Sequence, residues 1–275
     1  MQPHETLACV ELALYVALLL PTTFCTIHYL LRGQTAWLYL HAFVIAKIAG
    51  PALLIYISEH SSPSTDMQMA AQILYQIALG PLMSSTLSFV NASSKTDKYN
   101  SGPSYSPLNA LGSKKGSSFF LLLIHPIIMV GLVLGIIGGI DRSPSSDGTI
   151  NTDKYDRGAT FSKASAALFM VALLAITLGC LFLWKTRKGL AISSRYIFTC
   201  LPVVLPMLLL RILYSVLNAA NLDTSTSSGH TTKYNIMNGS WGIYFVMGFI
   251  PQACITIVYI GSGVLAWKRS RGGRQ

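Results

Sequence analysis

Three ionisable side chains lie inside long apolar stretches of this sequence, where a charge is energetically expensive. Glu11, Lys47 and Arg211 each fall well within a run of hydrophobic residues. An ionisable group in such a setting needs an ion-pair partner or a polar cavity, and such groups commonly bind ions or substrates or transfer protons. Because two cations accompany one carboxylate, an ion pair leaves a positive charge, which an anionic ligand, a neutral lysine or water would satisfy.

Polar companions recur at helical spacing near these charges. Side chains three, four or seven residues apart share a helix face, which groups Tyr15 with Glu11 and Tyr214 with Arg211. We expect six companions to line one interior pocket with the three charges: Tyr15, Gln72, Gln76, Tyr214, Asn218 and Gln252. Pro251 frees a backbone carbonyl and could bend its helix around this pocket. An inert ion pair that only fastens helices together is the alternative interpretation.

The composition defines the elements that must position these residues. Hydrophobic residues make up 52% of the chain and charged residues only 11%, where soluble proteins carry about 25% charged residues. This excludes a soluble enzyme, a disordered chain and a disulfide scaffold. The net charge of +10 does not indicate nucleic-acid binding, because the basic residues flank apolar runs. The sequence therefore predicts a polytopic membrane protein whose surroundings are lipids.

Seven runs are long enough for a transmembrane helix, which needs about 20 apolar residues. They cover residues 6–31, 36–57, 67–90, 118–140, 161–184, 196–219 and 241–267. We expect an all-α fold, a seven-helix bundle that forms one domain over residues 1–275. Polar stretches at 91–117, 141–160 and 221–235 are predicted loops. Gly131, Gly135 and Gly139 form a small-residue ridge that permits close helix approach.

The distribution of basic residues predicts the orientation. If the amino terminus is outside, thirteen Lys and Arg residues fall on the cytoplasmic side and five on the other. The positive-inside rule then places the N-terminus in the lumen and the C-terminus in the cytoplasm. At 1.5 Å per residue, Glu11, Arg211 and Lys47 lie roughly 8, 12 and 15 Å from the lumenal ends of their helices. We expect a protein of the endoplasmic reticulum membrane with its pocket opening to the lumen.

Several chemistries lack their usual residues. No Asp-rich motif is present that could hold Mg²⁺ against a diphosphate, and no histidines have metal-ligand spacing. The seventh span has no central lysine for a retinal Schiff base, and all five cysteines fall inside predicted spans. We therefore expect no metal, no cofactor and no disulfide framework.

Four segments carry a resemblance to a known group. They are Glu-Leu-Ala-Leu-Tyr at 11–15, Lys-Ile-Ala-Gly at 47–50, and residues 206–217 and 241–252. In this order they resemble small fungal seven-helix membrane proteins that include the membrane-bound terpene cyclases of ascofuranone- and ascochlorin-type pathways. Two positions depart from that group: Lys47 stands where Arg is common, and Gln252 stands where Glu is common.

The resemblance implies cyclisation of an epoxidised, farnesylated aromatic (meroterpenoid) substrate without a metal. Glu11 would be the general acid, with Tyr15 and Tyr214 orienting it or stabilising cationic intermediates. Arg211 and Lys47 would hold a phenolate or polar head. The remaining polar residues would contact this lipophilic, prenylated substrate: Gln72, Gln76, Asn218 and Gln252. A small-molecule or lipid transporter or sensor that uses the same pocket is the alternative, and a structural protein with an ion-paired core is the third.

Overall fold

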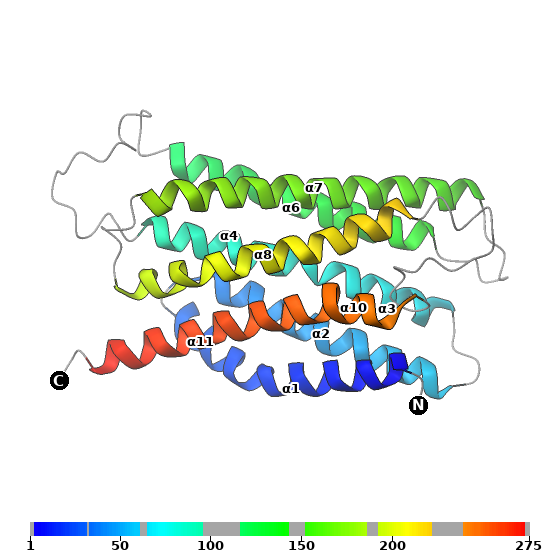
Figure 1. Ribbon diagram of the computed structural model, residues 1–275, viewed down its shortest axis with the longest axis horizontal. Coiled ribbons are helices and arrows are strands. Elements are labelled where there is room, and N and C mark those ends of the chain that lie inside the picture. Colours follow the sequence, from blue (N-terminus) through cyan, green and yellow to red (C-terminus); the bar gives the residue numbers. More distant parts are fainter. Residues whose placement is uncertain are drawn as a thin grey trace.

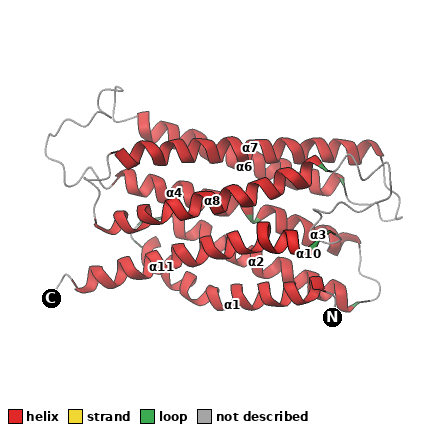
Figure 2. Ribbon diagram, viewed as in Figure 1, coloured by secondary structure: helices red, strands yellow, loops and turns green. Residues whose placement is uncertain are grey.

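The computed structural model describes residues 3–31, 33–60, 65–95, 116–142, 152–185, 192–221 and 239–272. Within these ranges the regular structure is entirely helical (Figure 2). Seven helical segments are long and apolar enough to cross a membrane. The predicted all-helical fold with seven apolar spans is confirmed. The middle of the predicted linker, residues 96–115, and residues 222–235 of the last predicted loop lie outside the described residues.

The spans run side by side along the long axis of the molecule (Figure 1). In chain order the elements are α1 (Pro3–Leu30), α2 (Ala36–Glu59), α3 (Thr65–Ile77), α4 (Leu79–Lys95), α6 (Gly116–Asp141), α7 (Thr152–Lys185), α8 (Ile192–Ala220), α10 (Trp241–Tyr244), the π-helical turn η3 (Phe245–Phe249) and α11 (Ile250–Gly272). Figure 1 shows α6 and α7 along one side, α1 along the other, and α4 and α8 between them. The two termini lie at opposite ends of the bundle.

The third span was predicted as one helix over residues 67–90, and the structure breaks it in two. Ala78 is a turn residue between α3 and α4. Pro81 follows in the first turn of α4 and has no N–H to donate to the carbonyl of Ile77, so a continuous helix would lose a hydrogen bond there. A first-turn position suits proline. Gly80 beside it packs against the Leu132 side chain of α6, leaving no room for a Cβ. The break makes α3 a short, separate segment.

The seventh span changes its helix type near its start. After α10 the backbone forms η3, in which the Ile250 N–H bonds to the Phe245 carbonyl five residues back. Pro251 follows at once and cannot donate a hydrogen bond, and an irregular turn before a proline accommodates this loss. Gly248 lies under the ring of Tyr244, because a Cβ there would come within 2.6 Å of two ring carbons. The glycine therefore lets the Tyr244 ring lie along its own helix.

The fifth span begins earlier than predicted. We expected residues 141–160 to be a loop and the helix to start at 161, but α7 starts at Thr152. Arg157 on the extra turns makes a two-fold hydrogen bond to Asp141, at 2.8 and 3.0 Å. A Cβ atom added to Gly158 would lie only 2.9 Å from the Gly138 carbonyl oxygen, so the two helices are in close contact here. Contacts to α6 thus extend the helix beyond its apolar stretch.

The predicted glycine ridge on α6 lies at helix contacts. Gly131 and Gly135 face α7, where the Ser165 hydroxyl donates to the Gly131 carbonyl at 2.6 Å. Gly139 faces α3 instead. The tightest approach on this helix is at Gly138, outside the ridge, where an added Cβ would lie 2.6 Å from the Ser162 oxygen.

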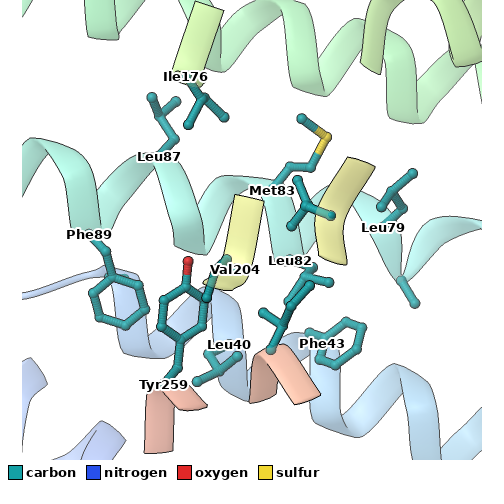
Figure 3. Packing of buried hydrophobic residues seen from close by; sticks show 14 of the residues in the cluster. Leu40, Phe43, Leu79, Leu82, Met83, Leu87, Phe89, Ile176, Val204 and Tyr259 are labelled. Carbon is teal, nitrogen blue, oxygen red and sulfur yellow. The ribbon is translucent and has the colours of Figure 1, made fainter. Parts of the chain in front are cut away.

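The apolar core centres on α4, as Figure 3 shows. Its side chains Leu79, Leu82, Met83 and Phe89 are essentially inaccessible and meet residues of α2, α7, α8 and α11. Large apolar side chains also cover the outside of the bundle. Examples are Leu20, Ile27, Leu174, Leu178, Leu181 and Val246, each more than half exposed. An apolar exterior of this kind suits a lipid environment.

Candidate functional site

A buried ion pair joins the first two helices. The Lys47 ammonium lies 2.5 Å from a carboxylate oxygen of Glu11, and the two side chains are 1% and 0% exposed. The sequence left open whether Glu11 meets Lys47 or Arg211, and the structure selects the lysine. Buried charges persist when they are paired and their remaining hydrogen-bonding capacity is satisfied.

Two tyrosine hydroxyls add hydrogen bonds to this pair. The Tyr244 hydroxyl accepts a hydrogen bond from Lys47 at 3.2 Å and donates to Glu11, with its two carboxylate oxygens at 3.1 and 3.2 Å. The Tyr75 hydroxyl donates to Glu11 at 3.3 Å. Its ring also lies 4.9 Å from the Lys47 nitrogen, within the range of a cation–π interaction. One ammonium and two phenols therefore surround the carboxylate.

Neither of these two tyrosines is among the predicted site residues. Tyr75 lies between Gln72 and Gln76, and Tyr244 lies three residues after the Trp241 that begins its span. A tyrosine inside an apolar helix, at the depth of the charges, is a signal that could have identified both. We expected Tyr15 to orient Glu11. Its ring instead packs edge-on against Phe43, and its hydroxyl lies beside Thr256 of α11.

Arg211 lies apart from this pair and is only 2% exposed. One terminal nitrogen donates to the Ser215 hydroxyl at 2.8 Å, and the other reaches the backbone carbonyl of Tyr75 at 3.5 Å. Its guanidinium carbon is 5.5 Å from the centre of the Tyr214 ring. The Nε atom is buried without a hydrogen bond, and no carboxylate pairs with the guanidinium, within the described ranges. Its positive charge is therefore uncompensated by that part of the chain.

A polar cleft opens beside Arg211, at the end of the bundle that holds the N-terminus. It measures about 460 Å³ including its open part, and its lining residues are Gln72, Gln76, Arg142, Ser162, Arg211, Tyr214, Ser215, Asn218 and Ala219. Five of the nine predicted site residues are in this set. No acidic side chain is among these lining residues. Buried oxygens of Gln76 and Ser162 have no hydrogen-bond partner among the described residues. The cleft thus offers unused polar groups around a cationic wall.

Arg142 is a second cation on this cleft, at a position predicted to lie in a loop. Its Nε donates to the Gly138 carbonyl at 2.9 Å. Burial lowers the pKa of this guanidinium, although arginine remains charged at neutral pH. The adjacent carboxylate of Asp141 is occupied by Arg157. An added Cβ at Gly158 would lie 2.8 Å from Arg142, so the close contact of α6 and α7 fixes where this side chain lies.

Glu11 lines a second, smaller cavity. This space measures about 220 Å³ including its open part, and its lining residues are His4, Leu7, Ala8, Glu11, Leu54, Tyr75 and Tyr244. Most of this lining is apolar or aromatic. Tyr75 separates the two spaces, because its hydroxyl bonds to Glu11 while its carbonyl accepts from Arg211. We expected a single pocket, and the structure divides it in two.

Three predicted site residues line neither space: Tyr15, Lys47 and Gln252. Gln252 is fully buried, and neither its amide nitrogen nor its amide oxygen has a hydrogen bond within the described ranges. Its backbone carbonyl accepts from the Thr256 hydroxyl at 2.8 Å. These residues support the interior of the bundle rather than a wall of either cavity.

The fold and this arrangement define a seven-helix membrane-type bundle with an ion pair in its interior and a cationic cleft at one end. The chain belongs to a protein family described as a domain of unknown function (DUF7702), whose model matches residues 1–269. No curated protein and no solved structure matches the chain. The terpene-cyclase resemblance therefore rests on the short motifs alone and stays a prediction.

Proposed function

We propose that the protein is a membrane receptor or carrier that binds a small polar anion in the cleft beside Arg211. The supporting observation is a charge count. Lys47 neutralises Glu11, whereas Arg211 is buried without a carboxylate partner in the described part of the chain. A buried unpaired charge is strongly unfavourable, and an anion in the cleft would compensate it. Arg142 adds a second positive charge on the same wall.

The lining indicates the chemistry of this anion. Guanidinium groups bind carboxylate and phosphate oxygens with geometry that neutral donors cannot match. The other polar lining groups are the side-chain amides and hydroxyls of Gln72, Gln76, Ser162, Ser215 and Asn218. Such groups suit a ligand that carries hydroxyl groups besides its negative charge. We therefore infer a hydroxylated carboxylate or a phosphate.

Binding to purified protein in lipid nanodiscs tests this proposal. The probes are gluconate, glycerol phosphate and inorganic phosphate, with sorbitol as the neutral analogue of gluconate. We expect an anion to bind and sorbitol not to bind. Arg211→Gln should weaken binding about ten- to hundredfold, the equivalent of about 1.5–3 kcal/mol for a hydrogen bond to a charged group. Arg211→Lys should retain part of the affinity because it keeps the charge.

Lys268→Gln is the matched control, since it removes an exposed positive charge near the C-terminal end of α11, at the other end of the bundle from the cleft. It should bind like the wild type. Absence of binding for all three anions, or equal binding by the wild type and Arg211→Gln, would contradict the proposal.

The resemblance motivates a second candidate, a metal-independent terpene cyclase acting on a prenylated aromatic substrate. The observation that favours it is the position of Glu11 on the wall of the smaller cavity, among apolar and aromatic side chains. A carboxyl group in such surroundings can deliver a proton to an epoxide away from bulk water. Membranes that contain the protein would then convert a farnesylated phenol epoxide to a cyclic product. Glu11→Gln would abolish that conversion, and absence of product with the wild type would contradict the cyclase.

Under either function we propose that the cleft faces the lumen of the endoplasmic reticulum. The support is the excess of basic residues on the segments of the opposite side, thirteen against five. A small epitope tag at each terminus tests this. The C-terminal tag should be accessible to antibody from the cytoplasm and the N-terminal tag should not.

A further inference from the structure

We propose that the ligand of the cleft is a hydroxylated dicarboxylate, an anion with one carboxylate at each end of a chain that carries hydroxyl groups. This inference rests on the proposed anion-binding function and narrows the ligand from a carboxylate or phosphate in general to one with two separated negative charges. Three features of the cleft support it: the number of its cations, their different depths, and the unpaired polar atoms around them.

The cleft has two cationic side chains in its lining and no anionic one. Arg211 of α8 and Arg142, which directly follows α6, both line it. The ion pairs that form among the described residues involve other side chains, so neither of these arginines has a carboxylate partner there. A ligand with one negative charge would leave one guanidinium uncompensated, whereas a ligand with two carboxylates would neutralise both.

The two arginines lie at different depths in the bundle. Helices α6 and α8 both end at the end that holds the N-terminus, as Figure 1 shows. Arg142 comes directly after the last residue of α6, whereas Arg211 is nine residues before the end of α8 at Ala220, roughly 14 Å along the helix at 1.5 Å per residue. Arg142 is half-buried and Arg211 is almost inaccessible. One cation therefore lies near the mouth of the cleft and the other in its interior.

Each guanidinium is held by its own helix. Arg142 donates from Nε to the Gly138 carbonyl at 2.9 Å, four residues back along α6. Arg211 donates to the Ser215 hydroxyl at 2.8 Å, four residues forward along α8. The two side chains thus extend toward each other in depth, and the gap between them is shorter than the distance between their backbone positions. Because separate helices anchor them, two anionic groups joined by a short carbon chain match them better than one group that carries both charges.

Unpaired polar atoms beside the two cations suit hydroxyl groups on that chain. The amide oxygen of Gln76 and the hydroxyl oxygen of Ser162 line the cleft and are buried without a hydrogen-bond partner in the described part of the chain. Gln76 belongs to α3 and Ser162 to α7, so the two atoms come from different helices. The Gln76 oxygen can only accept a hydrogen bond. A ligand hydroxyl can donate to it, a carboxylate cannot, and a buried acceptor left unpaired is unfavourable.

Titration calorimetry of the wild type in lipid nanodiscs compares matched probes at neutral pH and needs no variant. Glucarate and gluconate share one hydroxylated chain, and only glucarate has a carboxylate at both ends. Glucarate should bind about ten- to hundredfold more tightly, the gain expected from hydrogen bonds between a second pair of charged groups. Adipate, the dicarboxylate of the same chain length without hydroxyl groups, should bind more weakly than glucarate. Glycerol phosphate, which carries its charges on one group, should also bind more weakly than glucarate.

Three variants assign the second carboxylate to Arg142. Arg142→Gln should weaken gluconate binding only severalfold and remove most of the preference for glucarate. Arg142→Lys should keep part of that preference because it keeps the charge. Lys154→Gln is the control, since it removes an exposed positive charge near the start of α7, at the same end of the bundle and outside the lining of the cleft. It should leave the preference unchanged.

The outcomes separate this inference from the proposed function. If the wild type binds glucarate and gluconate equally, or binds glycerol phosphate more tightly than glucarate, the dicarboxylate is overturned and anion binding stands. If Lys154→Gln reduces the preference as much as Arg142→Gln does, the preference reflects the general attraction of a basic protein for a dianion, and the assignment to Arg142 is overturned. Adipate binding as tight as that of glucarate would overturn the role of the hydroxyl groups. If none of the probes binds, the proposed function itself fails.

Discussion

Replacing Lys47 by methionine isolates the energetic role of the interior ion pair. Methionine has a similar length and no charge, so the substitution leaves Glu11 with two tyrosine hydroxyls and no cation in contact. The carboxylate is fully inaccessible and the lysine is 1% exposed, so solvent cannot replace the lost partner. Removing one member of a buried pair destabilises a protein by about 3–5 kcal/mol. We expect a loss of this size for Lys47→Met.

A second substitution, at Glu11, distinguishes the effect of the unpaired carboxylate from the effect of losing the lysine side chain. Glu11→Gln in the Lys47→Met background removes the stranded charge, and the amide can still accept hydrogen bonds from Tyr75 and Tyr244. The double variant should therefore be more stable than Lys47→Met alone. The Glu11→Gln single variant and the wild type complete a double-mutant cycle, and the four stabilities together give the interaction energy between the two side chains.

Thermal unfolding in a mild detergent measures these effects. A chain of 275 residues unfolds with an entropy of about 0.6 kcal/mol/K, so the single variant should lose about 5–9 °C in Tm. Lys268→Met, an exposed lysine at the far end of α11, is the control and should change Tm by less than about 1 °C. If Lys47→Met is no less stable than this control, or if the double variant is less stable still, the reasoning about the buried pair is wrong.

Three further substitutions test how the site is positioned. Tyr244→Phe removes the hydroxyl that bonds to both members of the ion pair and should lower stability by about 1.5–3 kcal/mol in thermal unfolding. Gly248→Val places atoms where the Tyr244 ring lies, so the ring must move, and the variant should lower Tm at least as much as Tyr244→Phe does. Equal Tm values for Gly248→Val and the wild type would contradict the described packing. Gly158→Val should displace Arg142 and weaken gluconate binding severalfold. Gly179→Val, at a position with nothing within 4 Å, should leave binding unchanged, and an equal effect of the two valines would exclude a specific role for the α6–α7 contact.

The number of spans was predictable because hydrocarbon demands long apolar helices. Where the prediction of a boundary was wrong, contacts to other helices decided it. The first turns of α7 are polar, and they are helical through contacts such as Arg157 to Asp141 and Gly158 to α6. Pro81 is a local signal for the break at Ala78, but the apolar run continues across this position, so hydropathy alone predicts one helix. Composition thus predicts the membrane core better than it predicts helix ends.

The site was predictable to the extent that depth and helical face determine it. Gln72 and Gln76 share a face of α3, and Arg211, Tyr214 and Asn218 share a face of α8. The two faces line one cleft. The partner of Glu11 depends on which helices are neighbours, which spacing along one chain does not encode. The tyrosines of the ion pair reach it from other spans for the same reason.

The length of α7 has a consequence for how the protein sits at a membrane surface. Its 34 residues extend about 51 Å at 1.5 Å per residue, whereas the hydrocarbon layer is only about 30 Å thick. Even a tilted helix of this length must project into the headgroup zone. The early turns of α7 carry Ser162 and support Arg142, so this side of the cleft opening lies at the level of the phospholipid headgroups. Bilayer thickness would then govern how much of that opening water can reach.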